Sequence, residues 1–186
     1  MDVSYRRPSA ADWAELRDAR LAALAEAPYA FASTLERERA FPDDVWRERA
    51  GGGRTVAAWQ GDAIVGMATV LPRDHDGPAS GRRPYSDSTN WHLVGMWASP
   101  DVRGKDVARR LMADACALAR QSGAKTMTLW VTEVNDRARA FYRKVGFRPT
   151  GARQLVRPEE PDHWEEELGL RLDQASAGAG ASTGKS

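Results

Sequence analysis

Apolar residues recur at helical spacing in four stretches of the chain. The clearest runs from Arg103 to Ser122, where apolar side chains share one face and Gly123 follows as a stop signal. That face is formed by Val107, Leu111, Ala115 and Leu118. Three further helices are predicted at residues 10–27, at residues 42–50 and directly after Asn135, a residue type suited to capping a helix start. The pattern therefore predicts about four helices.

Shorter runs rich in β-branched and apolar residues predict the strands. They cover residues 3–6, 54–59, 63–71, 90–98, 126–132, 147–152 and 164–172. Gln60-Gly61-Asp62 separates two of them as a hairpin turn would. The helix at 104–122 is a crossover that makes its two flanking strands parallel, so the sheet should be mixed and the fold class α/β (mixed α+β).

Two segments stand apart from this pattern. Residues 72–88 are rich in Pro, Gly, Asp and Arg, which predicts a long exposed loop. Residues 173–186 are rich in Gly, Ala and Ser, which predicts a disordered C-terminal tail. We therefore expect one domain over residues 1–172.

The composition narrows the classes of function. The 186 residues carry 27 Lys and Arg against 26 Asp and Glu, a net charge of +1 that does not favour bulk binding to nucleic acid. The sequence has neither a secretion signal core nor an apolar run long enough for a membrane span, so we expect no membrane association and a cytoplasmic location. A homodimer stays open.

The few metal-ligand residue types are scattered. Cys116 is the single cysteine and lies mid-helix, where a small buried residue is expected rather than a nucleophile. The three histidines, His75, His92 and His163, form no H-x-x-x-H pair. We therefore expect no metal site.

The segment from Arg103 to Met112 is the best candidate for binding chemistry. A strand ends at Ala98, a turn follows, and a helix begins among glycine, small and basic residues. Helix starts present unpaired N–H groups and a partial positive charge, which makes them suitable for phosphate. The spacing fits neither the Walker phosphate loop nor the dinucleotide-binding fingerprint. An ordinary strand–turn–helix with solvated basic residues would show the same pattern.

A second segment supports the interpretation of residues 103–112 as a binding site. The run from Arg103 to Ala108 resembles the acetyl-CoA signature [RQ]-x-x-G-x-[GA] of the GNAT superfamily of acyl-CoA-dependent N-acetyltransferases. The run from Asn135 to Phe147 is similar to that family's second signature, N-x-x-A-x-x-F-Y-x-x-x-G-F. The resemblance covers roughly residues 3–172 and implies the GNAT fold, a mixed sheet of about seven strands flanked by about four helices.

The resemblance implies an acetyl-CoA site along the end of one strand and the start of the next helix. The backbone of Met96, Trp97 and Ala98 should pair with the pantetheine arm, beside a bulge at Gly95. The pyrophosphate should be held by the amides of Gly104, Lys105, Asp106, Val107 and Ala108, with help from Arg103. Asn135 should contact the cofactor near the start of its own helix.

Catalytic roles follow from the same resemblance. Tyr142 matches the position whose hydroxyl protonates the departing thiolate, and its alternative role is core packing beside Phe141. The general base has two candidates. Glu133 follows the strand that ends at Thr132, and otherwise is a solvated loop carboxylate. His92 lies in the strand before the signature, and otherwise is a packing residue.

The implied activity is transfer of an acetyl group to a primary amine of a small molecule or peptide by direct attack. Asp106 is the departure from the family pattern, because the signature has glycine there. Its carboxylate either weakens binding of an anionic cofactor or simply stabilises the helix start. Asp106 therefore supports an alternative hypothesis, in which the chain is a GNAT-fold acyl-CoA-binding or regulatory module with weak or no catalysis.

Aromatic residues are the candidates for the acceptor site. In the family this site forms from the first two helices, their connecting loop and the strand edges. The candidates here are Tyr29, Phe31, Phe41, Trp46, Trp91, Trp97 and Trp130. Aromatic walls would suit a hydrophobic or aromatic amine, and for each residue core packing is the alternative.

Overall fold

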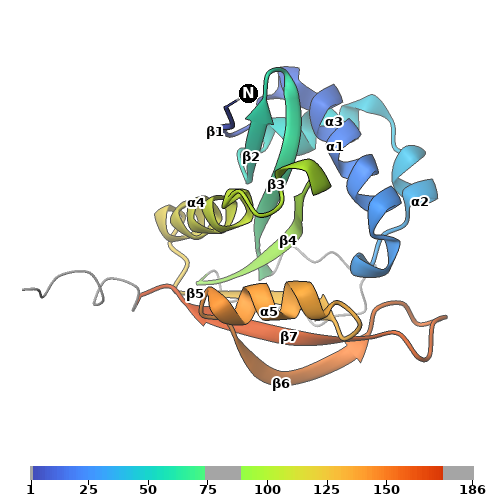
Figure 1. The fold of residues 1–186 in the computed structure, drawn as a ribbon, viewed down its shortest axis with the longest axis vertical. Helices are drawn as coiled ribbons and strands as arrows, with labels where there is room; N and C mark the ends of the chain where they lie inside the picture. The colour runs from blue at the N-terminus through green and yellow to red at the C-terminus, as the bar shows by residue number, and fades with distance from the viewer. Residues whose placement is uncertain (1, 74–88, 174–186) are drawn as a thin grey trace, which may run out of the picture.

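The computed structural model describes residues 2–73 and 89–173. A seven-stranded mixed sheet in the order β1-β2-β3-β4-β5-β7-β6 forms its centre (Figure 1). The strands are β1 (Ser4–Arg6), β2 (Thr55–Gln60), β3 (Ala63–Pro72), β4 (Asn90–Ala98), β5 (Thr126–Thr132), β6 (Arg148–Leu155) and β7 (Trp164–Arg171). The predicted fold class and sheet are confirmed.

The α-helices are placed largely as the apolar spacing predicts. They are α1 (Trp13–Glu26), α2 (Leu35–Arg39), α3 (Asp43–Gly51), α4 (Val107–Gln121) and α5 (Asp136–Lys144). Short 3-10 turns flank them at η1 (Ala10–Asp12), η2 (Pro28–Ala30) and η5 (Pro100–Val102). The sequence did not predict α2, whose five residues are too few to show a period, although Thr34 caps it by accepting a hydrogen bond from the Arg37 amide.

The sheet splits between β4 and β5. β4 and β5 are parallel, as predicted, and they pair only from Asn90–Thr126 to His92–Thr128. Both strands continue for several residues beyond this short ladder. Their carboxyl ends therefore diverge, which exposes backbone groups of β4 that a full ladder would have used.

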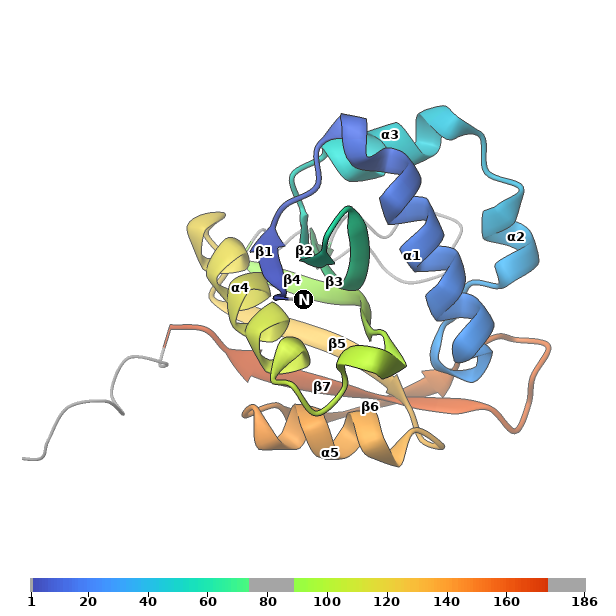
Figure 2. The ribbon, with the colours of Figure 1, turned by 45° about the horizontal axis from the view of Figure 1, so that its top comes forward.

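Helices cover both faces of the sheet, as alternate residues show. On β3, Ala68 and Val70 join the core cluster under α4 and α5, whereas Met67 joins the cluster under α1. Successive side chains of a strand point to opposite faces, so α4 and α5 share one face and α1 lies on the other. Figure 2 shows α4 and α5 apart from α1, α2 and α3.

The start of α4 corrects the sequence prediction. The helix was expected from Arg103, but it begins at Val107, after η5 and a further turn. Gly104 has φ 82° and Asp106 has φ 62°, both in the left-handed region that a right-handed helix excludes. The chain can therefore become helical only after Asp106.

Three sequence predictions lie partly outside these residues. Of the predicted loop at 72–88, Pro72 belongs to β3 and residues 74–88 lie outside the described residues, as does His75. Of the predicted tail, only Asp173 is described. Within the described ranges, no helix is both long and apolar enough to cross a bilayer.

Candidate active site

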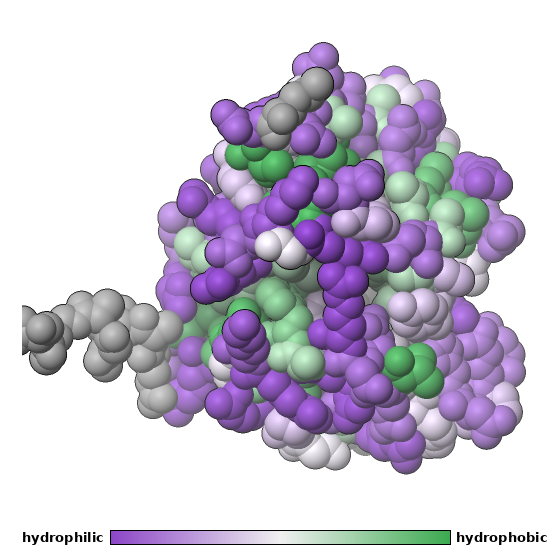
Figure 3. Space-filling model, in the orientation of Figure 1, coloured by the Kyte–Doolittle hydropathy of each residue, from purple (hydrophilic) through white to green (hydrophobic). Residues whose placement is uncertain are grey.

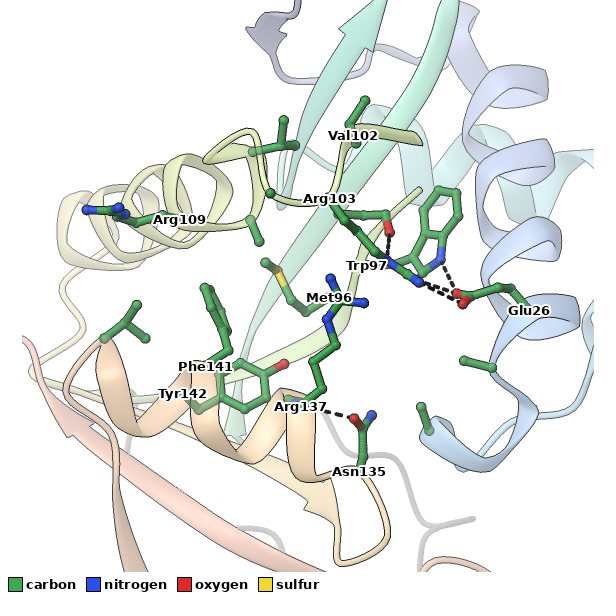
Figure 4. A pocket seen from close by; sticks show the side chains of 18 of the residues that line it. Glu26, Met96, Trp97, Val102, Arg103, Arg109, Asn135, Arg137, Phe141 and Tyr142 are labelled. Atoms are coloured by element: carbon green, nitrogen blue, oxygen red, sulfur yellow. Dashed lines mark hydrogen bonds and ion pairs between the residues drawn. The ribbon is translucent and has the colours of Figure 1, made fainter. Parts of the chain in front are cut away.

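A cavity of about 460 Å³ lies where β4 and β5 diverge, between α4 and α5. Figure 3 shows apolar residues gathered between these two helices, with hydrophilic residues around them. Met96, Phe141 and Tyr142 lie at its centre, and the end of α1 closes one side (Figure 4). Its volume is in the range of small-molecule and cofactor sites.

The β4 wall contains the predicted bulge. Gly95 has φ 63°, and the register with β3 shifts so that Met67 opposes Trp97 while Thr69 opposes Val94. The extra residue on β4 is what a bulge inserts. Met96, Trp97 and Ala98 all line the cavity, so the structure brings the predicted pantetheine strand to the site.

The start of α4 forms a second wall. Gly104, Asp106, Val107 and Ala108 line the cavity, as predicted, whereas Lys105 is exposed and is not among the lining residues. Asp106 occupies the N-cap position without a side-chain hydrogen bond to the helix, and the first helical bond joins the Arg110 amide to the Asp106 carbonyl. The amides of the first turn therefore keep the unpaired N–H groups and partial positive charge that suit an anion.

The carboxylate of Asp106 is paired with Arg109 and makes no hydrogen bond to these amides. Its Oδ1 lies 2.8 Å from Arg109 Nη2, and 74% of the side chain is exposed. The ion pair partly offsets the negative charge that the sequence places in the phosphate segment. Asp is also one of the few residue types that adopt the left-handed region readily, so it can replace the glycine of the signature.

Arg103 is held by a glutamate that the sequence analysis did not single out. Its Nη1 and Nη2 donate to Glu26 at 2.9 and 2.6 Å, and its Nε donates to the Ala98 carbonyl at 3.0 Å. The Trp97 indole also donates to Glu26, at 3.1 Å (Figure 4). The hydrogen bond from Arg103 lowers the pKa of Glu26, which therefore stays ionised at neutral pH. We refer to Glu26, Trp97 and Arg103 as the Glu26 clamp.

The first turn of α5 brings Asn135 and Arg137 to the cavity. The Asn135 side chain caps the helix by accepting a hydrogen bond from the Ala138 amide at 3.1 Å. Arg137 was not predicted, and its guanidinium extends across the cavity (Figure 4). Its place in the second signature, as a basic residue between Asn135 and Ala138, is the feature from which it could have been predicted.

Tyr142 combines both roles that the sequence left open. Its ring packs edge-on against Phe141 and Phe147, at centroid distances of 5.4 and 5.8 Å. Its hydroxyl points into the cavity (Figure 4) and makes no hydrogen bond to any residue that the structure describes. Burial raises the pKa of Tyr142, so the phenol keeps its proton throughout the neutral range.

The two candidate bases lie outside the cavity lining. Glu133 is held by Arg153 through contacts of 2.5 and 2.8 Å, and this hydrogen bonding lowers the pKa of Glu133. His92 is buried, with Nδ1 2.9 Å from the Thr128 hydroxyl. Neither position supports the base role, which stays a prediction.

The aromatic acceptor candidates divide into two groups. Tyr29, Phe31 and Trp97 line the cavity. The other four are outside its lining: Phe41, Trp46, Trp91 and Trp130. Trp46 and Trp91 are buried, which matches the alternative of core packing. Buried Cys116 is likewise a packing residue, and burial raises the pKa of its thiol.

No cluster of three or more His, Cys, Asp and Glu side chains suited to a metal ion occurs within residues 2–73 and 89–173.

Comparisons with known proteins agree with this geometry. The family model described as Acetyltransferase (GNAT) family matches residues 14–147. Among curated proteins, the peptidyl-lysine N-acetyltransferase YjaB of Escherichia coli is 38% identical over 64 residues, which is 34% of this chain and 40% of that protein. YjaB of Salmonella typhimurium is 34% identical over 67 residues, 36% of this chain and 43% of that protein. The matched region thus spans less than half the length of these relatives.

Solved structures share the fold. A GNAT-family acetyltransferase from Streptococcus pneumoniae superimposes with a TM-score of 0.72 at 16% identity, covering 91% of this chain and 99% of that one. The structure of yncA, a putative acetyltransferase from Salmonella typhimurium with its cofactor acetyl-CoA, gives a TM-score of 0.70 at 16% identity, covering 97% and 100%.

Proposed function

This chain belongs to the GNAT family of acetyltransferases, and from that premise we propose that it transfers an acetyl group from acetyl-CoA to a primary amine of a small molecule or peptide. One arrangement carries the proposal. The uncapped start of α4, the bulged end of β4 and the Tyr142 hydroxyl all face one cavity.

The residues around the cavity fit acetyl-CoA. The amides of Gly104 and of Asp106 to Ala108 would hold the pyrophosphate, because the start of α4 offers N–H groups and the Asp106 carboxylate is paired with Arg109. The Lys105 amide, which was also predicted to contribute, donates to the Val102 carbonyl at 3.3 Å instead. The free edge of β4 at Met96 to Ala98 would pair with the pantetheine arm. When bound, acetyl-CoA supplies an acetyl group activated as a thioester.

Tyr142 is the proposed proton donor. The neutral amine nitrogen would form a bond to the acetyl carbon and lose one proton to water, while the carbon–sulfur bond breaks. The sulfur would receive a proton from the Tyr142 hydroxyl, and water would return a proton to Tyr142. Burial raises the pKa of Tyr142, which alone would make it a poor donor. A thiolate released beside Tyr142 is also partly desolvated, which raises the pKa of the thiol and favours transfer of the proton to sulfur.

The alternative of a GNAT-fold binding module rested on Asp106. The ion pair with Arg109 partly offsets the charge of the carboxylate, which supports acetyl-CoA binding over this alternative. A cytoplasmic location stays part of the proposal, supported by the unpaired, buried Cys116.

Peptide lysine is the first acceptor to test, because both curated relatives are named peptidyl-lysine N-acetyltransferases. The experiment measures free thiol released from acetyl-CoA in the presence of a lysine peptide, the same peptide with its lysine blocked, and a panel of small primary amines. We expect thiol release that requires a free amine. Thiol release no faster than without an acceptor, across the whole panel, contradicts the proposal.

A further inference from the structure

Glu26 stands where three parts of the site meet. It is the last residue of α1, and the chain turns directly from it into η2 and Phe31, which border the cavity. Its two carboxylate oxygens receive the Arg103 guanidinium from the turn before α4 and the Trp97 indole from β4. One side chain therefore joins α1, the cofactor strand and the phosphate segment.

Arg103 is fully engaged by this arrangement. Its Nε holds the Ala98 carbonyl while both terminal nitrogens hold Glu26, in the planar fork that suits a carboxylate. The side chains of Arg103 and Glu26 are 27% and 33% exposed, so the pair is partly shielded from water. Arg103 would have to break these bonds to reach a phosphate with its guanidinium.

We propose that Glu26 is a positioning residue for the acetyl-CoA site. By holding Arg103 and Trp97, it fixes the end of β4 and the turn at residues 99–106, which leads into the uncapped first turn of α4. Arg103 then holds the end of β4 in place through Glu26 and the Ala98 carbonyl, and it is not a phosphate ligand. This inference rests on the proposed function.

A rival role for Glu26 predicts the opposite change in acetyl-CoA affinity when the charge of Glu26 is removed. If its carboxylate merely competes with cofactor phosphates for Arg103, removing its charge should release Arg103 and tighten binding. If Glu26 positions the site, the same change should weaken binding, because the turn loses its anchor.

The first test is calorimetric titration of acetyl-CoA into the native protein, Glu26→Gln and the control Glu48→Gln. Glutamine keeps the size of the side chain but loses the charge and one of the two acceptor oxygens. Glu48 lies on α3, is exposed and is outside the cavity lining. We expect Glu26→Gln to weaken binding at least about fivefold, the lower end of coupling between sites, with the control unchanged. Unchanged or tighter binding overturns the proposal.

A second readout needs no cofactor. Backbone hydrogen exchange of the cofactor-free protein should be faster over residues 99–106 in Glu26→Gln than in the native protein, because local opening follows the loss of local contacts. Glu48→Gln should leave that segment unchanged. Equal exchange over residues 99–106 in all three proteins overturns the proposal, and faster exchange everywhere in Glu26→Gln reveals general destabilisation and also overturns it.

A double-mutant cycle shows whether Arg103 acts together with Glu26 or binds a phosphate directly. We compare the acetyl-CoA dissociation constants of Glu26→Gln, Arg103→Gln and the double variant. If the two residues act as one clamp, the double variant should bind no more weakly than the weaker single variant. Fully additive losses would mean that Arg103 contacts the cofactor independently of Glu26. Failure of the native protein to bind acetyl-CoA sinks the proposed function itself, which keeps the two failures distinct.

Discussion

The starts of α4 and α5 face the same cavity but are built differently. At α5, Asn135 accepts a hydrogen bond from the Ala138 amide, so the helix closes its own first turn. At α4, Asp106 takes the N-cap position in the left-handed region and turns its carboxylate to Arg109, so no side chain closes the first turn. A helix start that is left open can hold an anion, and one that is capped has less to offer.

This difference assigns separate tasks to the two helices. α4 supplies the amides for the phosphates of acetyl-CoA, whereas α5 supplies Tyr142, whose hydroxyl faces the centre of the cavity. Changes at the start of α4 should therefore alter cofactor affinity, and changes on the inner face of α5 should alter turnover or helix stability.

Tyr142→Phe should have the largest effect. It removes the proposed proton donor while keeping the ring contacts with Phe141 and Phe147. We expect kcat to fall about 100-fold, the lower end for general acid catalysis, with little change in acetyl-CoA affinity. Steady-state kinetics and calorimetry measure the two quantities. Tyr5→Phe on β1, outside the cavity lining, is the matched control. An unaltered kcat would remove Tyr142 from the chemistry.

Ala108→Glu should act on affinity instead. It places a carboxylate in the first turn of α4, on the cavity side, where the phosphates are proposed to bind. We expect acetyl-CoA to bind at least about tenfold more weakly because like charges repel at short range. Ala113→Glu, exposed on the same helix, adds the same charge outside the cavity lining. Equal affinities for the two variants would place the phosphates elsewhere.

Asn135→Ala tests whether α5 depends on its cap. Loss of the hydrogen bond to the Ala138 amide should lower the free energy of unfolding by about 1 kcal/mol, the usual value of an N-cap. Urea unfolding followed by circular dichroism measures this change. A native-like unfolding midpoint would show that the cap of α5 does not stabilise the protein.

Asp106→Gly should have the smallest effect. The carboxylate is exposed and paired with Arg109, so its removal should tighten acetyl-CoA binding by less than about threefold, and by even less at high salt, where exposed charges are screened. Titrations at two salt concentrations measure it. A gain larger than about tenfold would mean that Asp106 points to the phosphates when the cofactor is bound.

The sheet and most helices could be predicted because their signals are local. β4 and β5 have the predicted bounds, Asn90–Ala98 and Thr126–Thr132, since apolar and β-branched runs end there at turn residues. The start of α4 was predicted four residues too early, because the sequence does not show that Gly104 and Asp106 adopt left-handed φ angles.

The missing parts of the site depend on contacts between distant residues. Glu26 meets Arg103 across 77 positions of the chain, and no periodicity or motif indicates such a pair. Glu133 pairs with Arg153 across 20 positions of the chain. The position of Glu133 next to a strand end does not indicate this pair, so the sequence favoured a role as general base. Motifs identified the cofactor side of the cavity, whereas these side-chain partners became visible only in the folded chain.

The central claim is that the open start of α4 and the free edge of β4 hold acetyl-CoA. Calorimetric titration of acetyl-CoA into the native protein and into Ala108→Glu tests it most directly. The account predicts one-to-one binding to the native protein that is weakened at least about tenfold in the variant. Absence of any binding heat from the native protein at about millimolar acetyl-CoA, the weak limit of measurable affinity, would contradict it.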